Sequence, residues 1–306
     1  MAHRRFREGC RACHRAWLLC WLLASPLAAA ERLLLLYPVV REPYQTVYRE
    51  IVAGLAAHDP GSALVVRPLD GGGELPPADA VVALGRRAVA AAAATGRPVF
   101  AAVANRRDLA VPGCCRAALL LRPSARAYLE PLLAFFPRVS RVLVVYAEGE
   151  DGELVRTAEQ WLAARGRRLL ALPAADLEGA AQAWRTALAA ARPGDGVWLL
   201  AGNGLLDMTL VDLVLDVAWE KRLAVFSANP ALVRRGALYA VYPDNRGVGG
   251  RLAEILAAAE EGRLPEGHVE PLERVQVAYN ERTGNHLGIG LTPALRARID
   301  LLLAPF

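Results

Sequence analysis

Short apolar runs alternate with amphipathic segments along most of the chain. The runs are typical of strands buried on both faces of a parallel sheet, and they cover residues 33–37, 63–66, 80–84, 98–104, 117–121, 141–146, 168–172, 196–200, 223–226, 237–242 and 275–279. Between them, apolar residues at helical spacing predict helices over 44–57, 86–95, 125–136, 153–165, 177–191, 207–221 and 247–261. This alternation predicts an α/β protein whose parallel sheets are covered on both faces.

The alternation falls into two consecutive runs that meet at Arg122-Pro123-Ser124. Two βα stacks in sequence predict two Rossmann-like lobes, each with its own parallel sheet. Three segments carry no clear period: the acidic stretch 147–152, the polar connection 262–273, and the terminal segment 286–303. We expect the first two of these to be loops.

Residues 226–250 are the most informative stretch. A strand ends at Ser227-Ala228-Asn229, a short helix and a strand follow, and a new helix begins around Gly247, Gly249 and Gly250. Small polar residues just beyond a parallel strand cap the next helix and occupy the edge where open α/β sheets hold ligands.

The first 30 residues have the pattern of a secretory signal peptide. Five arginines precede a short apolar core at 16–23, and Ala28-Ala29-Ala30 offers a cleavage site before Glu31. An uncleaved N-terminal anchor is the alternative. Most of the formal net charge of +5 lies in this segment, so the remainder is nearly neutral and gives no electrostatic reason to expect nucleic-acid binding. We expect a periplasmic protein.

Residues 31–306 lack the usual constellations of catalysis and metal binding. Their histidines (His58, His268, His286) are far apart, and no nucleophile elbow or phosphate loop occurs. The acidic stretch from Glu148 to Glu153 is a solvated surface or a weak cation site. Adjacent Cys114 and Cys115 are expected to be two thiols or a strained disulfide. Aromatic residues, including Trp161, Trp184 and Trp219, are expected to pack in the core or between the lobes rather than to stack on nucleic-acid bases. We therefore expect no enzyme, no metal and no cofactor.

The chain also resembles a known family through several spaced motifs. These are Phe226-Ser227 followed by a helix and Gly236-Ala237-Leu238, the segment 242–253 with Asp244 and Gly247, and Asn280 followed by Leu287-Gly288-Ile289 and Pro293. A weaker match is Phe135-Phe136-Pro137 with Tyr146. Together they resemble the substrate-binding proteins of ABC transporters with the periplasmic-binding-protein type I fold, whose characterised members include binders of tryptophan and other amino acids.

The resemblance implies two lobes, joined by three crossing strands, that close on a ligand. Residues 31–121 plus 242–273 would form one lobe, and 122–241 plus 274–306 the other. It further implies an extracytoplasmic monomer that captures a small molecule, an amino acid or small anion, and delivers it to a membrane permease.

Carried over position by position, the resemblance places ligand-binding residues in the loops after the strands of each lobe. They are Arg41, Gly85, Arg86, Asn105, Ser124, Tyr146, Asn203, Ser227, Asn229 and Asp244. Each also has a purely structural interpretation, since serine, asparagine and aspartate commonly cap helices or shape turns and Tyr146 could belong to the core.

Several first-lobe positions depart from the family pattern. Gly85-Arg86-Arg87 replaces a hydroxyl residue followed by proline or alanine, Asn105-Arg106 replaces Asp-Pro, and 119–122 replaces Gly-Val-Ser. Arg41, Arg86 and Arg106 would favour an anionic ligand. The departures also allow a second hypothesis, in which a ligand-poor protein of this fold serves as a sensor or accessory that docks an envelope receptor.

Overall fold

The structure is a computed structural model that describes residues 32–42, 44–59, 61–69, 74–109 and 114–304. The signal peptide expected at 1–30 lies outside these described residues. Within them, no helix combines the length and the apolar character needed to cross a membrane.

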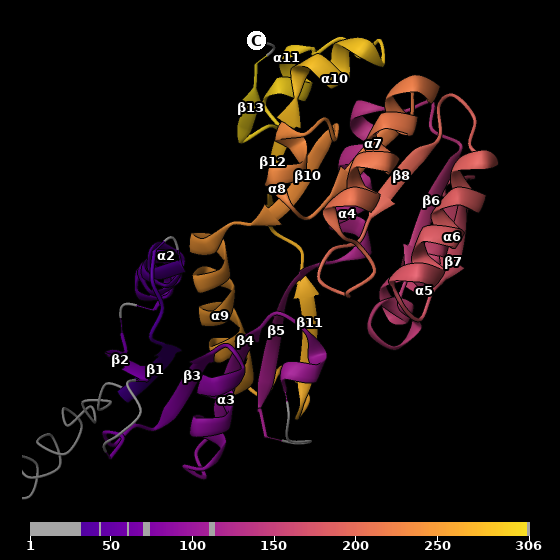
Figure 1. Cartoon of the computed structure of the whole chain (residues 1–306). Helices are drawn as coiled ribbons and strands as arrows, with labels where there is room; N and C mark the ends of the chain where they lie inside the picture. Colours follow the sequence, from indigo (N-terminus) through magenta and orange to yellow (C-terminus); the bar gives the residue numbers. More distant parts are fainter. Residues whose placement is uncertain (1–31, 43, 60, 70–73, 110–113, 305–306) are drawn as a thin grey trace, which may run out of the picture.

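The described residues form two separate sheets, shown one above the other in Figure 1. The six strands of the lower sheet, sheet A, run in the order β11-β5-β4-β3-β1-β2, and all pair in parallel. Their bounds are β1 Arg32–Pro38, β2 Ala63–Leu69, β3 Ala80–Leu84, β4 Val99–Val103, β5 Ala117–Pro123 and β11 His268–Leu272.

Helices cover both faces of sheet A, as its continuous apolar strands require. Helices α2 (Tyr44–His58) and α9 (Asn245–Glu260) pack on one face, and α3 (Arg86–Ala93) packs on the other. A 3-10 turn, η1 (Arg106–Asp108), follows β4. The alternation along β1 illustrates the arrangement, because Leu33 and Leu35 join the first core and Leu34 and Leu36 the second.

Sheet B has seven strands in the order β13-β12-β10-β9-β8-β6-β7. All described pairings are parallel except that of β12 with β10. The strand bounds are β6 Arg141–Tyr146, β7 Arg168–Pro173, β8 Gly196–Leu199, β9 Ala224–Ser227, β10 Tyr239–Pro243, β12 Val275–Asn280 and β13 Leu301–Leu303.

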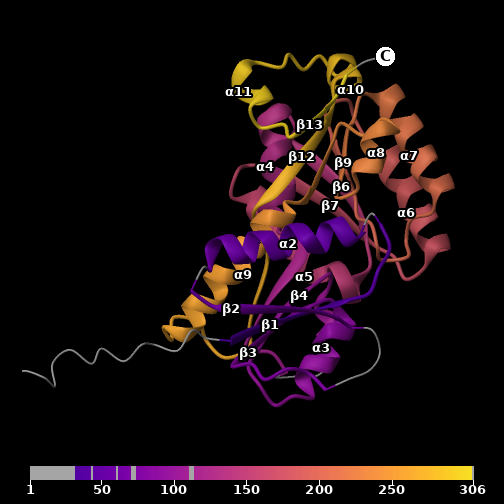
Figure 2. The ribbon, with the colours of Figure 1, turned by 90° about the vertical axis from the view of Figure 1, so that its left-hand side faces the viewer.

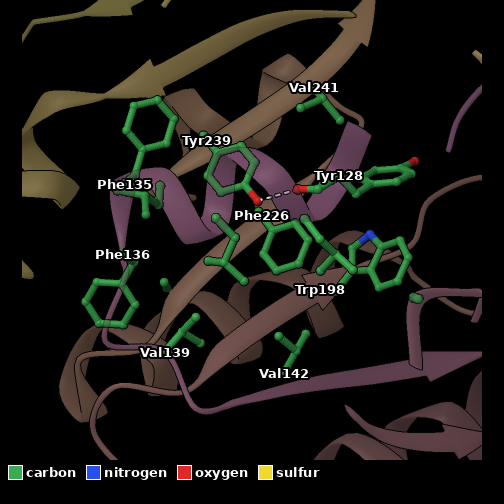
Figure 3. Close-up of a cluster of buried hydrophobic side chains, with 14 of the residues drawn as sticks. Tyr128, Phe135, Phe136, Val139, Val142, Trp198, Phe226, Tyr239 and Val241 are labelled. Carbon is green, nitrogen blue, oxygen red and sulfur yellow. Dashed lines mark hydrogen bonds between the residues drawn. The ribbon is translucent and has the colours of Figure 1, made fainter. Parts of the chain in front are cut away.

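An aromatic core fills one face of sheet B, beneath α4 (Ala125–Phe135) and α5 (Glu148–Ala163). Figure 3 shows the buried Tyr239 side chain donating its hydroxyl to the Tyr128 carbonyl of α4, 2.7 Å away. Helices α6 (Leu177–Ala189) and α7 (Met208–Lys221) cover the other face. The remaining helices are short: α8 Pro230–Arg234, α10 Glu281–His286 and α11 Pro293–Arg296.

The chain passes between the sheets three times. It does so between β5 and α4, between β10 and α9, and between β11 and β12. The Ser124 amide donates to the Leu272 carbonyl at 2.9 Å, so the first and third passages are hydrogen-bonded to each other. Helix α9 thus follows a strand of sheet B in sequence but lies on sheet A (Figure 1).

The contact that holds α9 on sheet A is a close crossing with α2 (Figure 2). A Cβ on Gly249 would overlap the Ile51 carbonyl oxygen, and a Cβ on Gly54 would overlap the Arg246 carbonyl oxygen. One on Gly250 would lie 2.9 Å from the His58 ring. Glycine is therefore needed here because the two backbones approach more closely than any side chain allows.

The structure confirms the predicted α/β class with two parallel-sheet lobes and corrects the two segments expected to be loops. The acidic stretch expected as a loop begins α5 at Glu148, where carboxylates favour the positive end of the helix dipole. The connection 262–273 contains strand β11, which lacks an apolar run because it lies at a sheet edge. The terminal segment contains α11 and β13.

Cys114 and Cys115 are both free thiols in this structure. Their sulfur atoms are 2.9 Å apart, just before β5. Burial, followed by the hydrogen bond to Cys114, raises the pKa of the Cys115 thiol to about 12. A raised pKa means a small thiolate fraction at neutral pH, so Cys115 is a poor nucleophile in the folded protein.

We predict that Gly249→Ala destabilises the protein, because the new methyl group forces α2 and α9 apart. The expected cost is about 2 kcal/mol, a melting temperature roughly 4–8 °C lower by differential scanning calorimetry. Gly149→Ala is the matched control, since Gly149 is also helical but has open space around its Cβ position. Equal melting temperatures for Gly249→Ala and the wild type would contradict the close crossing.

We also predict slow alkylation of Cys115 in residues 31–306 carrying Cys114→Ser. At pH 8 the folded protein should react with iodoacetamide about a hundredfold more slowly than the urea-unfolded chain. Because its folded-state pKa is raised, the rate should keep increasing with pH above 10, where the unfolded thiol has already levelled off. Superimposable pH profiles would show that burial does not control this thiol.

Candidate functional site

The carboxyl ends of the two sheets face each other. Arg106 and Arg107, which follow β4 of sheet A, contact the first turns of α5, which follows β6 of sheet B. The Arg106 guanidinium lies 3.6 Å from the Glu153 carboxylate, and Arg107 pairs with Glu150. Ligands of open α/β sheets bind at this edge, beyond the carboxyl ends of the strands.

A cavity of about 470 Å³ lies at this boundary, within the range typical of small-molecule sites. Sheet A contributes the loop after β4, the end of β5 and part of β11. The other wall comes from the start of α4 and one side of α5. The lining includes Asn105, Arg106, Arg107, Arg122, Ser124, Arg126, Glu148, Glu150, Glu153, Arg156, Trp161, Val269 and Glu273.

Asp151 is the most constrained charged group at the boundary, with its side chain only 1 % exposed. It accepts from the Arg122 guanidinium at 2.5 Å, from the Asn203 side-chain amide at 2.7 Å, and from the Ala147 backbone amide at 2.9 Å. Arg122 also donates to the Glu150 carbonyl at 3.1 Å. A buried carboxylate is tolerated because a cation and further donors compensate it. This network links the end of β5 to α5 and to the loop after β8.

The other ion pairs around the cavity are more open to solvent. In the pair of Arg106 and Glu153 both side chains are more than half exposed, and Arg156 pairs with Glu148 at 2.9 Å on the same helix. Exposed pairs such as these contribute little to stability and exchange readily with solvent. Their arginines are therefore accessible to a competing anion, whereas Arg122 is held by Asp151.

The cavity brings together two of the predicted site residues, Asn105 and Ser124. The Asn105 backbone amide donates to the Asp108 carboxylate at 3.1 Å, which shapes the turn after β4. The Ser124 hydroxyl accepts from the Ala127 amide at 3.1 Å and caps α4. Ser124 thus has the helix-capping role that the sequence left open, and it also lines the cavity.

Tyr146 and Asn203 lie nearby, on the sheet B side of the boundary. A hydrogen bond with Glu148, together with burial, raises the pKa of Tyr146. Asn203 donates to Asp151 and accepts from the Leu205 amide at 3.1 Å, so its side chain is engaged within the protein.

Ser227 and Asn229 also make internal contacts. Ser227 is fully buried, and its hydroxyl donates to the Leu199 carbonyl at 2.9 Å between neighbouring strands. Asn229 is exposed and caps α8 by accepting from the Ala231 amide at 3.0 Å.

The remaining predicted residues lie around the edge of sheet A. Asp244 is half-buried at the start of α9 and makes no side-chain cap there. Arg41 and Arg86 are exposed in the loop after β1 and at the start of α3. Gly85 has a φ of 83°, a left-handed conformation that favours glycine between β3 and α3. None of these residues lines the cavity described above.

The predicted ligand-binding residues leave out Asp151, which the structure places at the boundary. Arg122 lies there too, within the segment 119–122 that departs from the family pattern, and Trp161 lines the cavity. Asp151 belongs to the acidic stretch predicted as a loop, but it lies in the first turn of a helix that follows a buried strand, a position where such sheets place functional residues. Among the described residues, no group of three or more histidine, cysteine, aspartate or glutamate side chains could hold a metal ion.

No protein-family model matches the chain, and no curated protein matches it. Solved structures do match. One is the open, ligand-free structure of CD0873, a substrate binding protein with adhesive properties from Clostridium difficile, at 15 % identity and a TM-score of 0.63. Another is an ABC domain in complex with L-Trp from Streptococcus pneumonia, at 15 % identity and a TM-score of 0.53. Each alignment covers 90 % of this chain and 100 % of the other.

This chain has the periplasmic-binding-protein type I fold. The fold is shared with regulators as well, for example the xylose-binding transcription activator xylR, at 17 % identity and a TM-score of 0.50 over 81 % of this chain and 68 % of that one. These neighbours are described as binding proteins and regulators. At 15–17 % identity these comparisons show the fold that this chain shares with binding proteins and regulators, and not which of the two roles it has.

We predict that Asp151→Asn weakens the protein strongly, because a neutral amide cannot compensate Arg122 and places its own N–H groups against donors. The expected loss is about 3 kcal/mol in the free energy of unfolding, measured by urea denaturation. Glu153→Gln removes a charge from an exposed pair and should cost less than about 0.5 kcal/mol. If both variants lose the same stability, the Asp151 network is not the principal electrostatic link at the boundary.

Proposed function

We propose that this protein is an extracytoplasmic solute-binding protein of an ABC-type transporter. It would hold a small molecule between two lobes, residues 31–121 plus 242–273 and residues 122–241 plus 274–306. The observation that carries the proposal is the cavity lined by the carboxyl-end loops of one sheet and by helices packed on the other. No covalent step is involved.

Binding in such a protein is a shift of population between open and closed lobes. A ligand that touches both walls of the cavity favours the closed arrangement, since it interacts with both lobes only there. The three passages between the sheets supply connections about which such closure can occur. The permease would then distinguish the closed form from the open one.

The cavity chemistry favours an amino acid or a small anion. Arg106, Arg126 and Arg156 supply guanidinium groups on partly open sites, and the amides at the start of α4 lie beside them. Guanidinium groups and helix N-termini both bind carboxylates. Glutamates on the same lining offer acceptors for an ammonium group. The complex of a structural neighbour with L-Trp is consistent with this ligand class.

The proposal places the protein in the periplasm, after removal of residues 1–30. Asn105 and Ser124 are its best supported ligand-facing residues because they line the cavity.

A second candidate function is a ligand-poor sensor or accessory that docks an envelope receptor. The observation in its favour is that the cavity arginines already have carboxylate partners, including Glu150 and Glu153 across the boundary. In that case the ion pairs themselves would keep the lobes together.

A thermal-shift screen of residues 31–306 against amino acids, organic acids, phosphonates and purines tests the first proposal. A ligand at a hundred times its Kd adds about 2.7 kcal/mol, which gives a clear rise in melting temperature. Thr157→Trp, which fills the cavity, should abolish the shift. Thr209→Trp, on an exposed face of α7, is the matched control and should retain it.

A saturable shift that survives Thr157→Trp would place the ligand elsewhere. No shift across the panel, with no ligand-induced compaction by small-angle X-ray scattering, would favour the accessory function. Loss of uptake of the identified ligand in cells that lack this protein would test the transport step.

A further inference from the structure

A second pocket lies on sheet B at the end remote from the cavity. It forms where the last turn of α7, the end of α8 and helix α10 converge. Helix α7 ends just before β9 begins, and Gly236 precedes β10. The pocket therefore sits at the amino ends of these strands, opposite the carboxyl ends that face sheet A. In Figure 1, α7 and α10 lie at the top, away from sheet A. We call this the polar-end pocket.

The polar-end pocket has an apolar floor and a charged rim. Its volume is about 280 Å³. Buried side chains form the floor: Leu215, Ala218, Leu223, Val225 and Leu287. Arg234, Arg235, Arg282 and Asp216 contribute to the lining together with Trp219 and His286. An apolar floor with polar groups around it is the common composition of a recognition site.

Trp219 is packed against His286 at this pocket although 38 % of it is exposed. The prediction that Trp219 packs in the core or between the lobes is wrong, because its side chain lies at the surface of this pocket. The His286 ring stacks on the indole, with centroids 3.7 Å apart and planes 7° apart. His286 Nε2 lies 2.8 Å from the Trp219 carbonyl, and Arg222 donates to the His286 carbonyl at 3.2 Å. A surface indole fixed in this way loses little conformational entropy on binding.

The rim carries an excess of positive charge. Arg235 pairs with Asp212. Within the described residues, Arg234 and Arg282 make no ion pair, and the Arg282 guanidinium lies 5.3 Å from the centroid of the Trp219 ring. Asp216 is the one carboxylate of the described lining, so it offsets only part of this charge. The rim thus presents two guanidinium groups that are open to an anionic partner.

We propose that the polar-end pocket docks an acidic segment of a partner protein. Exposed tryptophan and arginine side chains dominate the binding energy of protein interfaces, and here both flank an apolar floor. The rim is spread over three helices and open to solvent, which suits a chain with several carboxylates and an apolar side chain better than a single small anion.

This inference goes beyond the proposed transport function because the pocket and the cavity are separate. Every lining residue of the pocket belongs to elements packed on sheet B. A movement between the two sheets would therefore leave the pocket unchanged, so the partner would bind the open and closed forms with equal affinity. Such a site can tether the protein to its partner whether or not a ligand is bound in the cavity.

Fluorescence anisotropy with a labelled peptide of alternating glutamate and leucine tests the proposal on residues 31–306. We expect saturable binding that is weakened by added salt, and none to the matching lysine–leucine peptide. Arg234→Glu combined with Arg282→Glu should weaken it at least about tenfold, and Trp219→Ala by a similar factor. Arg185→Glu on exposed α6 is the matched charge control and should change the affinity less than about twofold.

Circular dichroism and melting temperatures confirm that each variant is folded, with Arg234→Gln and Arg282→Gln as milder replacements. Equal loss with Arg185→Glu, or unchanged binding in the pocket variants, would overturn the proposal. If free glutamate or succinate displaces the peptide at a concentration equal to that of the peptide, the pocket is instead a site for a small anion. The cavity-filling Thr157→Trp variant should bind the peptide normally, which separates this proposal from the transport function.

Discussion

The close crossing of α2 and α9 is the contact on which the two-lobed arrangement depends. Residues 245–260 follow a strand of sheet B, yet they complete the helical layer of sheet A. Gly54, Gly249 and Gly250 make this possible, because any side chain there would hold the two backbones apart. Once α9 is fixed on sheet A, β11 follows it into that sheet, and a third passage must then take the chain back to sheet B. A local steric requirement therefore determines the topology of the connections.

Electrostatics act at the boundary that those connections create. Asp151 is buried there and is compensated by Arg122, Asn203 and a backbone amide, so the charge belongs to the structure of the boundary. The pairs of Arg106 and Arg107 lie further out and interact with α5 through an exposed carboxylate, Glu153, and a half-buried one, Glu150. A ligand carboxylate can compete for the outer arginines at small cost, whereas displacing Asp151 would leave a buried charge without a partner. This division separates groups that stabilise the protein from groups available for binding.

The parallel sheets also give each lobe two chemically different ends. The carboxyl ends of the strands meet at the cavity. A change in the angle between the two sheets alters the distances between residues on its opposite walls. The amino ends of β9 and β10 lie beside the polar-end pocket, whose lining elements all pack on sheet B. Sites at these two ends can respond differently to the same movement: the first depends on closure and the second does not. One fold can thus combine a site whose geometry changes on closure with a site whose geometry does not.

The sequence by itself determined the α/β class, the alternation of elements and several exact bounds, such as 80–84 and 141–146, because buried parallel strands need continuous apolar runs. It also placed glycines 249 and 250 in a helix, whereas their close contact with α2 came only from the tertiary structure. Strand β11 was missed, since an edge strand has no continuous apolar run and its pairing with the distant β5 cannot be seen in the local sequence. Only the tertiary structure decided which polar residues serve the fold. Ser227 and Asn203 look alike as candidate ligand-binding residues, but both bond within the protein. Ser227 donates to the Leu199 carbonyl, and Asn203 donates to Asp151, which was not a candidate. Local periodicity reports burial, whereas the role of a polar side chain depends on which distant groups surround it.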